Sequence, residues 1–306
     1  MSPSKSATAT VAGVAISHPD RVIYPGSKIT KIQLAEYIAA VGPLMLPHVG
    51  GRPLSLVRCP DGVAGTCFFQ KHWPGLPPDV LDTVSILQGN GQRRMYVAVG
   101  DVAGLVALVQ WGVLEIHPWG SRTDDPDCPD RIIFDLDPGP GVSWKSTQQA
   151  ARGLGALLDE LGLASWVKTT GGKGLHVVVP IARRSRWDEV SEFARAVASQ
   201  MESVFPDQFI IKASKAEREG VIFIDWLRNT RGATAIAPWC PRARAEAGVS
   251  VPISWDQLAT IKRGDQFTLP RLRRSTPTID DPWRDMLASR QGLTKAMMKS
   301  LKKSSR

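Results

Sequence analysis

The spacing of apolar residues divides the first half of the chain into short strands and two helices. Apolar positions recur on one side of a helix expected over residues 31–46, and the prolines and glycines between 43 and 53 are expected to end it. A second helix is expected over residues 101–110. Apolar or alternating runs predict strands over residues 11–16, 53–57, 66–69, 95–99 and 113–117.

The second half repeats a rhythm of strand, helix and strand. Helices are expected over residues 144–161, where Gly162 supplies a C-cap, and over 188–205, where apolar residues recur at helical spacing. Strands are expected over residues 131–137, 166–170, 175–179, 209–212 and 221–226. This order predicts a mixed α/β (α+β) fold that places its chemistry at strand ends and in turns.

The length of 306 residues suits one large domain or two closely packed ones. We expect a disordered leader over residues 1–10, a single domain over 11–290 and a basic tail over 291–306. Within the domain we expect an N-terminal subregion over about 11–120 and a catalytic core over about 121–250. From Arg284 onward seven residues are basic and one is acidic, which fits either a nucleic-acid-binding arm or a solvated tail.

Composition indicates a globular protein with an excess of positive charge. The hydrophobic fraction of 43% is sufficient for a substantial core, and the net charge of +9 favours polyanionic partners, although it also suits a merely solubilising surface. Four cysteines form no CxxC pair, so we expect reduced thiols rather than a zinc site or a disulfide scaffold. No signal peptide or stretch of 18 apolar residues is present, which predicts a cytoplasmic protein without membrane contact.

Three acidic residues follow buried strands. Asp135 and Asp137 alternate on one face of the run IIFDLD, about 7 Å apart at the backbone, and Asp225 ends the run VIFID. Carboxylates this close repel one another unless a cation lies between them, and oxygen ligands suit Mg²⁺ or Mn²⁺. The alternatives are an exposed acidic pair at a strand end and, for Asp225, a structural ion pair with Arg228 or Arg231.

Two further segments carry groups that bind phosphate. The glycine-rich run from Lys168 to His176 allows backbone amides to face an anion, with donors at Thr170, Lys173 and His176. It is not a Walker A loop, because no Ser or Thr follows the lysine. Downstream, four arginines lie within 17 residues and could offset the charge of a triphosphate: Arg228, Arg231, Arg242 and Arg244. A plain hairpin and a solvated basic loop are the alternatives.

Taken together, these motifs resemble the polymerase domain of bacterial ligase D, a member of the archaeo-eukaryotic primase superfamily. The resemblance rests on FDLDP (134–138), KTTGGKGLHVVVP (168–180) and IDWLRNTRGATAIAP (224–238). Upstream, VIYPGSKITK, GRPLSLVRCPDGVAGTCFFQKH and EIHPW also match, so that the likeness runs from about residue 12 to 290. It implies a primase-like fold with an antiparallel-rich, RNA-recognition-motif-like core.

The resemblance also assigns roles to residues of this chain. The implied metal-binding and catalytic residues are Asp135, Asp137 and Asp225. The implied nucleotide-binding residues are Thr170, Lys173, His176, Arg242, His117 and Thr234. The implied DNA-binding residues are Phe68 and Phe69, which would stack on template bases, and Arg21 and Lys31, which would bind a 5′-phosphate at a gap or break.

The implied function is addition of NTPs or dNTPs to a primer 3′-hydroxyl with two divalent ions, Mn²⁺ or Mg²⁺. The family adds gap filling at broken or gapped DNA in end joining, Ku and an ATP-dependent ligase as partners, and a place at the nucleoid. One rival is a phosphotransferase of the haloacid-dehalogenase type, although Pro138 and Gly139 follow the DxD where that family has Gly-Thr. The other is a non-catalytic nucleic-acid-binding module.

Overall fold

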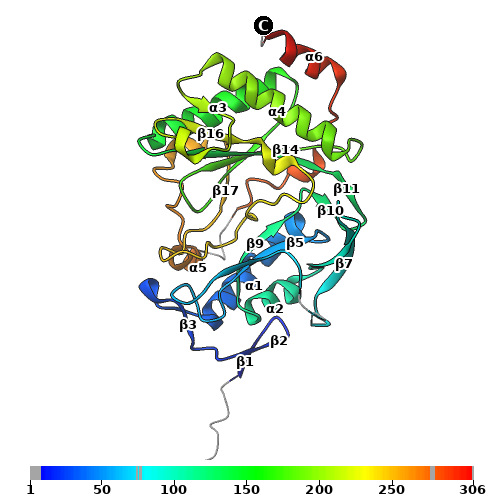
Figure 1. Ribbon diagram of the computed structural model, residues 1–306. Coiled ribbons are helices and arrows are strands. Elements are labelled where there is room, and N and C mark those ends of the chain that lie inside the picture. Colours follow the sequence, from blue (N-terminus) through cyan, green and yellow to red (C-terminus); the bar gives the residue numbers. More distant parts are fainter. Residues whose placement is uncertain (1–7, 74, 76–77, 276–279, 305–306) are drawn as a thin grey trace, which may run out of the picture. The chain divides into compact units, whose positions relative to one another are not determined.

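The computed structural model describes residues 8–73, 75, 78–275 and 280–304 (Figure 1). Two compact units of comparable size make up the chain, and both are discontinuous in sequence. The first unit comprises residues 1–118, 236–250 and 267–280, and the second comprises 119–235, 251–266 and 281–306. In the described part of the chain, no helix combines the length and apolar character needed to cross a bilayer.

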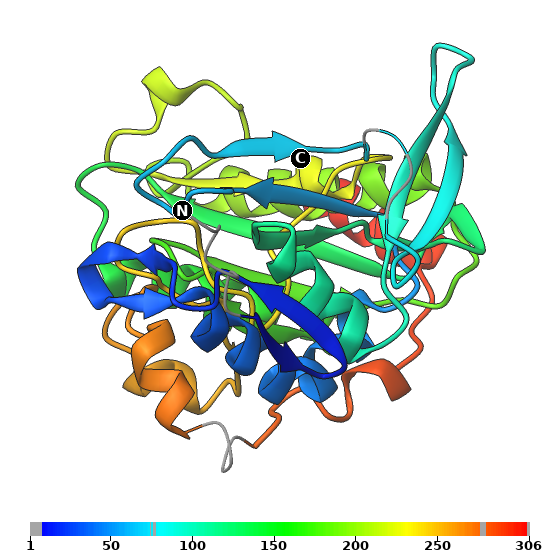
Figure 2. The same ribbon diagram turned by 90° about the horizontal axis from the view of Figure 1, so that it is seen from below.

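The first unit is built on a five-stranded sheet and two helices. Strand β5 (Leu54–Arg58) is central and pairs with β6 (Phe68–Gln70), β8 (Arg93–Ala98) and β9 (Val113–Pro118), all antiparallel. Strand β7 (Asp82–Leu87) pairs with β8, and this hairpin extends away from the sheet, in cyan in Figure 2. The unit also contains two small hairpins, β1 (Thr8–Val11) with β2 (Val14–Ser17) and β3 (Val22–Tyr24) with β4 (Ile29–Thr30).

Helix α1 (Lys31–Val49) packs against α2 (Val102–Gln110). The side chain of Thr30 begins α1 by accepting a hydrogen bond from the Gln33 amide in a capping box. The expected end at residue 46 was wrong by three residues, because α1 continues through Pro43 and Pro47 to Val49. Burial of Val41, Met45 and Val49 on one face offsets the hydrogen bonds that the two prolines cannot donate.

The second unit contains a six-stranded sheet in the order β15-β16-β12-β14-β13-β17, in which only the β15–β16 pair is parallel. Its two long helices, α3 (Trp144–Glu160) and α4 (Trp187–Val204), cover one face (Figure 1). The expected antiparallel-rich mixed sheet is therefore confirmed. The strands are β12 (Arg131–Pro138), β13 (Trp166–Thr169), β14 (Leu175–Pro180), β15 (Phe209–Ile210), β16 (Ile222–Asp225) and β17 (Pro252–Ile253).

Successive side chains of β12 point to opposite faces of the sheet, so that buried apolar residues lie on one face and the predicted catalytic acids lie on the other. Phe134 and Leu136 are fully buried, so Asp135 and Asp137 belong to the opposite face of the strand. The short hairpin of β10 (Ser121–Arg122) and β11 (Asp125–Pro129) leads into β12. That hairpin and β7 were not expected from the sequence, because their residues show no sustained apolar alternation.

The cysteines depart from the sequence-based expectation. Cys128 and Cys240 are buried thiols, but Cys59 and Cys67 form a disulfide. The register of β5 and β6 explains the pairing, because Arg58 lies opposite Phe68 and the next residues outward are therefore cross-strand neighbours. Spacing alone did not indicate this pair, since the two cysteines are eight residues apart.

The two chain ends can be compared with the expectation only in part. Residues 1–7 of the expected leader lie outside the described residues, and Thr8 already belongs to β1. In the expected tail, Lys295–Ser304 forms helix α6. Leu301 of α6 is buried, and Lys302 forms an ion pair of 3.1 Å with Glu192 of α4. Residues 295–304 therefore form a packed helix in this structure.

The buried side-chain amide of Asn229 continues the hydrogen bonding of the sheet beyond the end of β16. The side chain of Asn229, 1% exposed, accepts a hydrogen bond from the Ile133 amide at 2.7 Å and donates to the Ile133 carbonyl at 2.8 Å. It also donates to the Trp226 carbonyl at 2.9 Å. Because β16 pairs with β12 only from Asp135 onward, Asn229 satisfies the backbone of β12 where the strand partner is missing.

Replacing Asn229 with Ala should therefore lower the free energy of unfolding by about 2–4 kcal/mol, since two buried backbone groups of Ile133 lose their partners. Urea denaturation of the purified variant measures this. Asn90→Ala, in which an exposed asparagine is truncated, is the matched control and should cost less than about 1 kcal/mol. Equal midpoints for the two variants would contradict the role given to Asn229.

Candidate active site

Four charged or titratable side chains form a row across the second unit's sheet. Strand register pairs Lys168 of β13 with His176 of β14, His176 with Asp135 of β12, and Asp135 with Asp225 of β16. Residues paired in this way have neighbouring side chains on one face of the sheet. Asp137 lies two residues beyond Asp135 and shares that face. The structure thus brings together the three acids and the histidine that the sequence singled out.

Arginines balance the charge of these acids. Arg228 bridges two of them, with 3.1 Å to Asp135 Oδ2 and 3.1 Å to Asp225 Oδ2. Arg218 lies 3.1 Å from Asp137 Oδ2 and also donates to the Ala213 carbonyl. The ion pair of Asp225 with Arg228, one of the two open interpretations of that acid, is therefore present, and it does not separate Asp225 from the other two carboxylates.

The protonation of the row follows from burial and neighbouring charge. Burial and the Lys168 ammonium lower the pKa of His176 to about 4, so its ring is neutral at pH 7. Burial alone would raise the pKa of Asp135, but His176, 3.4 Å from Asp135 Oδ1, and Arg228 hold it well below its usual range. Burial and the charge of Asp135 raise the pKa of Asp137 and of Asp225 against the opposing arginines.

The donor set of this row suits a hard divalent cation. The three acids supply only carboxylate oxygens, the ligands that Mg²⁺ and Mn²⁺ prefer, and their mutual repulsion is relieved by added positive charge. Among the described residues, no three His, Cys, Asp or Glu side chains already surround one point closely enough to hold an ion. The arginine contacts account for this arrangement, because each acid turns an oxygen toward a guanidinium group.

The glycine-rich run forms the turn between β13 and β14 and lies against β12. A Cβ at Gly174 would come within 2.3 Å of the Leu136 carbonyl, so only glycine fits there. Thr170 is buried, and its hydroxyl donates to the Gly174 carbonyl and accepts from the Gly172 amide. Lys173 is exposed and lines a pocket of about 320 Å³ that Pro138, Gly139 and Arg263 also line. Thr170 thus shapes the turn, and Lys173 is the available cation.

A second set of predicted residues meets in the first unit around Glu115. This buried carboxylate is 2.8 Å from His117 Nε2 and 3.1 Å from Arg242 Nε, and it accepts a hydrogen bond from the Ala243 amide at 2.8 Å. Burial by itself would raise the pKa of Glu115, but His117, Arg242 and the Ala243 amide together lower it to about 2. Glu115 therefore stays ionised and orients the two predicted nucleotide-binding side chains.

Phe68 and Phe69 of β6 are 43% and 50% exposed, so neither is a core residue. Phe69 contacts the edge of the His117 ring, and the Arg58 guanidinium lies 5.6 Å from the centre of the Phe68 ring. Both rings are open to stacking from solvent. Thr234, by contrast, lies in the second unit, where its carbonyl accepts a hydrogen bond from Arg228.

Arg21 and Lys31 line one pocket of about 280 Å³ in the first unit, together with His18 and Arg58. Lys31 is 8% exposed and donates to the Ser17 carbonyl and to Gln110 Oε1. Burial and the charge of Arg21 lower the pKa of Lys31 to about 8. The pocket thus concentrates cations where the sequence predicted a bound 5′-phosphate.

Four residues that contact or line the predicted sites were not identified from the sequence. Lys168 and Glu115 were quoted within motifs but given no role, although a charged residue inside an apolar strand is a usable signal. Arg218 gave no signal, because it lies outside every motif and meets Asp137 only through the fold. Arg58 likewise joins Arg21 and Lys31 only because β5 ends beside them.

The family model described as the LigD primase-polymerase domain matches residues 30–283. The multifunctional non-homologous end joining protein LigD of Pseudomonas aeruginosa is 39% identical over 296 residues, which is 96% of this chain and 35% of that protein. LigD of Mycolicibacterium smegmatis is 35% identical over 248 residues, 80% of this chain and 32% of that protein. The chain spans about a third of the length of these curated relatives.

Among solved structures, the polymerase domain of Mycobacterium tuberculosis ligase D in complex with DNA matches with a TM-score of 0.84. The match is 28% identical and covers 90% of this chain and 99% of that chain. This likeness confirms the fold class expected from the sequence.

Ionised Glu115 should make stability depend on pH. Its folded pKa of about 2 lies below the ordinary 4.5, so its contribution is present above pH 4.5 and is lost as the pH falls toward 2. The full contribution is on the order of 3 kcal/mol. Glu115→Gln should lower the free energy of unfolding at pH 7 and flatten its fall between pH 4.5 and 2 in chemical denaturation. The control Glu160→Gln, at an exposed site, should keep the slope of the unmodified protein.

Proposed function

Because the chain belongs to the LigD primase-polymerase domain family, we propose that it is a nucleotidyltransferase that adds NTPs or dNTPs to the 3′-hydroxyl of a DNA primer. One observation carries the proposal: strand register sets Asp135 opposite Asp225 with Asp137 on the same face, in a domain that carries separate phosphate-binding groups. The reaction is attack of the primer 3′-oxygen on the α-phosphorus of the nucleotide, with pyrophosphate as the leaving group.

Asp135, Asp137 and Asp225 would hold two divalent ions, Mn²⁺ or Mg²⁺, as their all-oxygen donor set and mutual repulsion suggest. When bound, such ions lower the pKa of the attacking hydroxyl and neutralise charge on the phosphates. His176, neutral at pH 7 and hydrogen-bonded to Asp135, keeps that carboxylate oriented. Arg228 and Arg218 would give up part of their carboxylate contacts and turn toward phosphate oxygens, because a guanidinium binds either anion.

Each unit carries groups that the family motifs assign to nucleotide binding. In the second unit Lys173 supplies a mobile ammonium and the turn shaped by Thr170 supplies backbone amides, while Thr234 lies beside Arg228. In the first unit Arg242 and His117 are held by Glu115 and would donate to triphosphate oxygens. These assignments rest on the match of each position to the family motifs and, for Thr170, Arg242 and His117, on polar contacts of the side chain.

The DNA would bind the first unit through stacking and phosphate contacts. Exposed Phe68 and Phe69 offer rings to template bases, and the pocket of Arg21, Lys31 and Arg58 suits a 5′-phosphate at the far side of a gap. The relatives are named as end-joining proteins, so we propose gap filling or end processing at double-strand breaks, in the cytoplasm at the nucleoid. Ku and an ATP-dependent ligase are the partners that this role implies.

The two rival functions fit less well. A dehalogenase-type phosphotransferase continues its DxD with Gly-Thr, whereas Pro138 and Gly139 follow Asp137 here. A non-catalytic binding module would have no need to keep three acids and a histidine in one row.

Asp137→Asn and Asp225→Asn should each reduce nucleotide incorporation at least about 100-fold, because each removes a carboxylate that the metal-dependent step needs. Extension of a labelled primer on gapped DNA measures this, with NTPs and dNTPs compared under Mn²⁺ and Mg²⁺. Neither change should lower folding stability, since burial and the charge of Asp135 disfavour both ionised acids.

The exposed acid Asp159 supplies the control, Asp159→Asn, which should extend primers normally. Near-normal extension by either site variant would exclude the metal assignment. Release of free phosphate from a phosphomonoester without DNA would favour the phosphotransferase instead.

The pocket of Arg21 and Lys31 should recognise a terminal phosphate, which carries more negative charge than an internal diester. Gapped DNA should bind several-fold more tightly when its downstream strand is 5′-phosphorylated, and the gain should shrink as salt rises. Changing both residues to Ala should remove the gain and leave affinity for the hydroxyl-terminated gap nearly unchanged. Fluorescence anisotropy at two salt concentrations measures both.

The control for this pair is Arg93→Ala with Arg94→Ala, which removes the same charge from the hairpin of β7 and β8. If the unmodified protein binds phosphorylated and hydroxyl-terminated gaps equally, the pocket has been assigned wrongly. If Arg21→Ala with Lys31→Ala weakens every DNA alike, the two residues are ordinary surface cations.

A further inference from the structure

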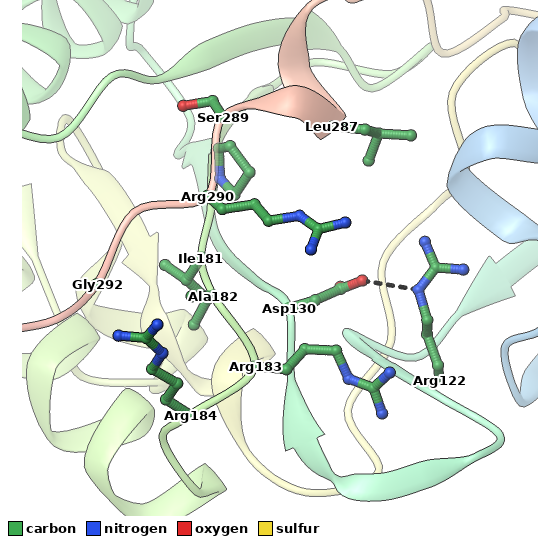
Figure 3. Close-up of a pocket in the computed structure, with 11 residues that line it drawn as sticks. Arg122, Asp130, Ile181, Ala182, Arg183, Arg184, Leu287, Ser289, Arg290 and Gly292 are labelled. Carbon is green, nitrogen blue, oxygen red and sulfur yellow. Dashed lines mark hydrogen bonds and ion pairs between the residues drawn. The ribbon is translucent and has the colours of Figure 1, made fainter.

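An arginine-lined pocket of about 560 Å³ lies in the second unit, at the end of the sheet opposite the acidic row (Figure 3). It is formed by three separate segments: the β10–β12 region, the residues after β14, and the segment that precedes α6. Its charged lining residues are four arginines and one aspartate: Arg122, Arg183, Arg184, Arg290 and Asp130. No motif identified in the sequence includes the arginines.

The single aspartate does not neutralise this pocket. Asp130 accepts from Arg122 at 3.2 Å on one oxygen and from the buried Arg131 at 3.2 Å on the other. Arg183 is oriented by two hydrogen bonds to Asp124, at 2.7 and 2.9 Å. Within residues 8–73, 75, 78–275 and 280–304, Arg290 has no carboxylate within ion-pair distance. Positive charge therefore remains available inside the pocket.

The backbone that carries Arg290 is fixed to the sheet. Gln291 pairs with Ile181 as a parallel bridge, and its carbonyl accepts from the Ala182 amide at 2.7 Å. The Gln291 side chain donates to the Pro180 and Ala164 carbonyls at 3.1 and 2.9 Å and accepts from the Ala164 amide. Arg290 thus starts from a rigid position, and in Figure 3 its guanidinium reaches toward Asp130 and Arg122.

The pocket is distinct from the acidic row. Asp130 precedes β12 and Asp135 of the row lies five residues further along, so at ~3.3 Å per residue roughly 16 Å separates them along the strand. The lining is mixed, because Pro180, Ile181 and Leu287 supply apolar surface beside the arginines. Such a lining matches a ligand that joins phosphate groups to a less polar surface, such as the face of a nucleobase.

We propose that this pocket is a second phosphate-binding site, which takes consecutive phosphates either of a nucleic-acid strand or of a free nucleoside polyphosphate. Arginine forks bind phosphate oxygens in pairs, and several guanidinium groups around one space favour a ligand with more than one charge. The volume exceeds that needed by a single inorganic ion. The site neither uses nor requires the three acids, so it stands apart from the proposed nucleotidyl transfer.

Hydrogen exchange tests the site without relying on catalysis. The full chain is mixed, in the presence of EDTA, with inorganic tripolyphosphate or with an eight-residue oligothymidylate. Residues 181–184 and 287–292 should gain protection with at least one of these probes. Protection by tripolyphosphate alone assigns the pocket to free polyphosphates. Protection by the oligonucleotide assigns it to a nucleic-acid strand. If neither probe protects these segments, the proposal is overturned.

Arg290→Ala and Arg290→Glu test whether the positive charge of Arg290 contributes to binding of the phosphate probe. The first should weaken binding of the protecting probe about tenfold, the loss expected for one charge-assisted contact, and the second should abolish the protection of both segments. The matched controls are Lys299→Ala and Lys299→Glu, on an exposed face of α6. They should leave the protection of both segments intact. Protection that survives Arg290→Glu, or equal protection by hexaglutamate, would show that the pocket is no phosphate site.

Discussion

The pairing of β12 with an antiparallel neighbour on each side fixes how the charged residues of the acidic row are arranged. Pairing with β14 sets Asp135 beside His176, and pairing with β16 sets Asp135 opposite Asp225. A shift of one residue in either register would turn the acids into the core and bring Phe134 to the other face. The apolar residues of β12 prevent such a shift, because their burial against the helices favours a single register. Core packing therefore fixes the geometry of the acidic row.

Like charges held together by a sheet must be balanced locally, and the structure does this with side chains from outside the sheet. Arg228 follows β16 by one short turn, and Arg218 precedes it, so both arginines approach the acids from the chain on either side of Asp225. The same solution occurs in the first unit, where one buried carboxylate holds a histidine and an arginine. In both places the side chains that bind the carboxylates lie near the surface. Each of them can bind another anion in place of its carboxylate.

The sequence predicted those parts of the fold that depend on local pattern. The long helices, β12, β14 and the alternation of Asp135 and Asp137 follow from apolar spacing, and the resemblance of three motifs indicated the acids and His176. It failed where tertiary contact outweighed local preference, as in α1, which continues through two prolines. It also failed where proximity arises only from folding: the disulfide of Cys59 and Cys67, and the contact of Arg218 with Asp137.

Gly174 limits which substitutions the glycine-rich turn can accept. A Cβ at this position would come within 2.3 Å of the Leu136 carbonyl, so the turn packs against the acid-bearing strand too closely for any side chain. Mutational libraries that vary the turn would therefore lose folded members at position 174 while tolerating change at Lys173, whose side chain is exposed. Neighbouring positions of this turn therefore differ in tolerance: position 174 requires glycine because of a backbone contact, whereas the side chain at 173 is exposed.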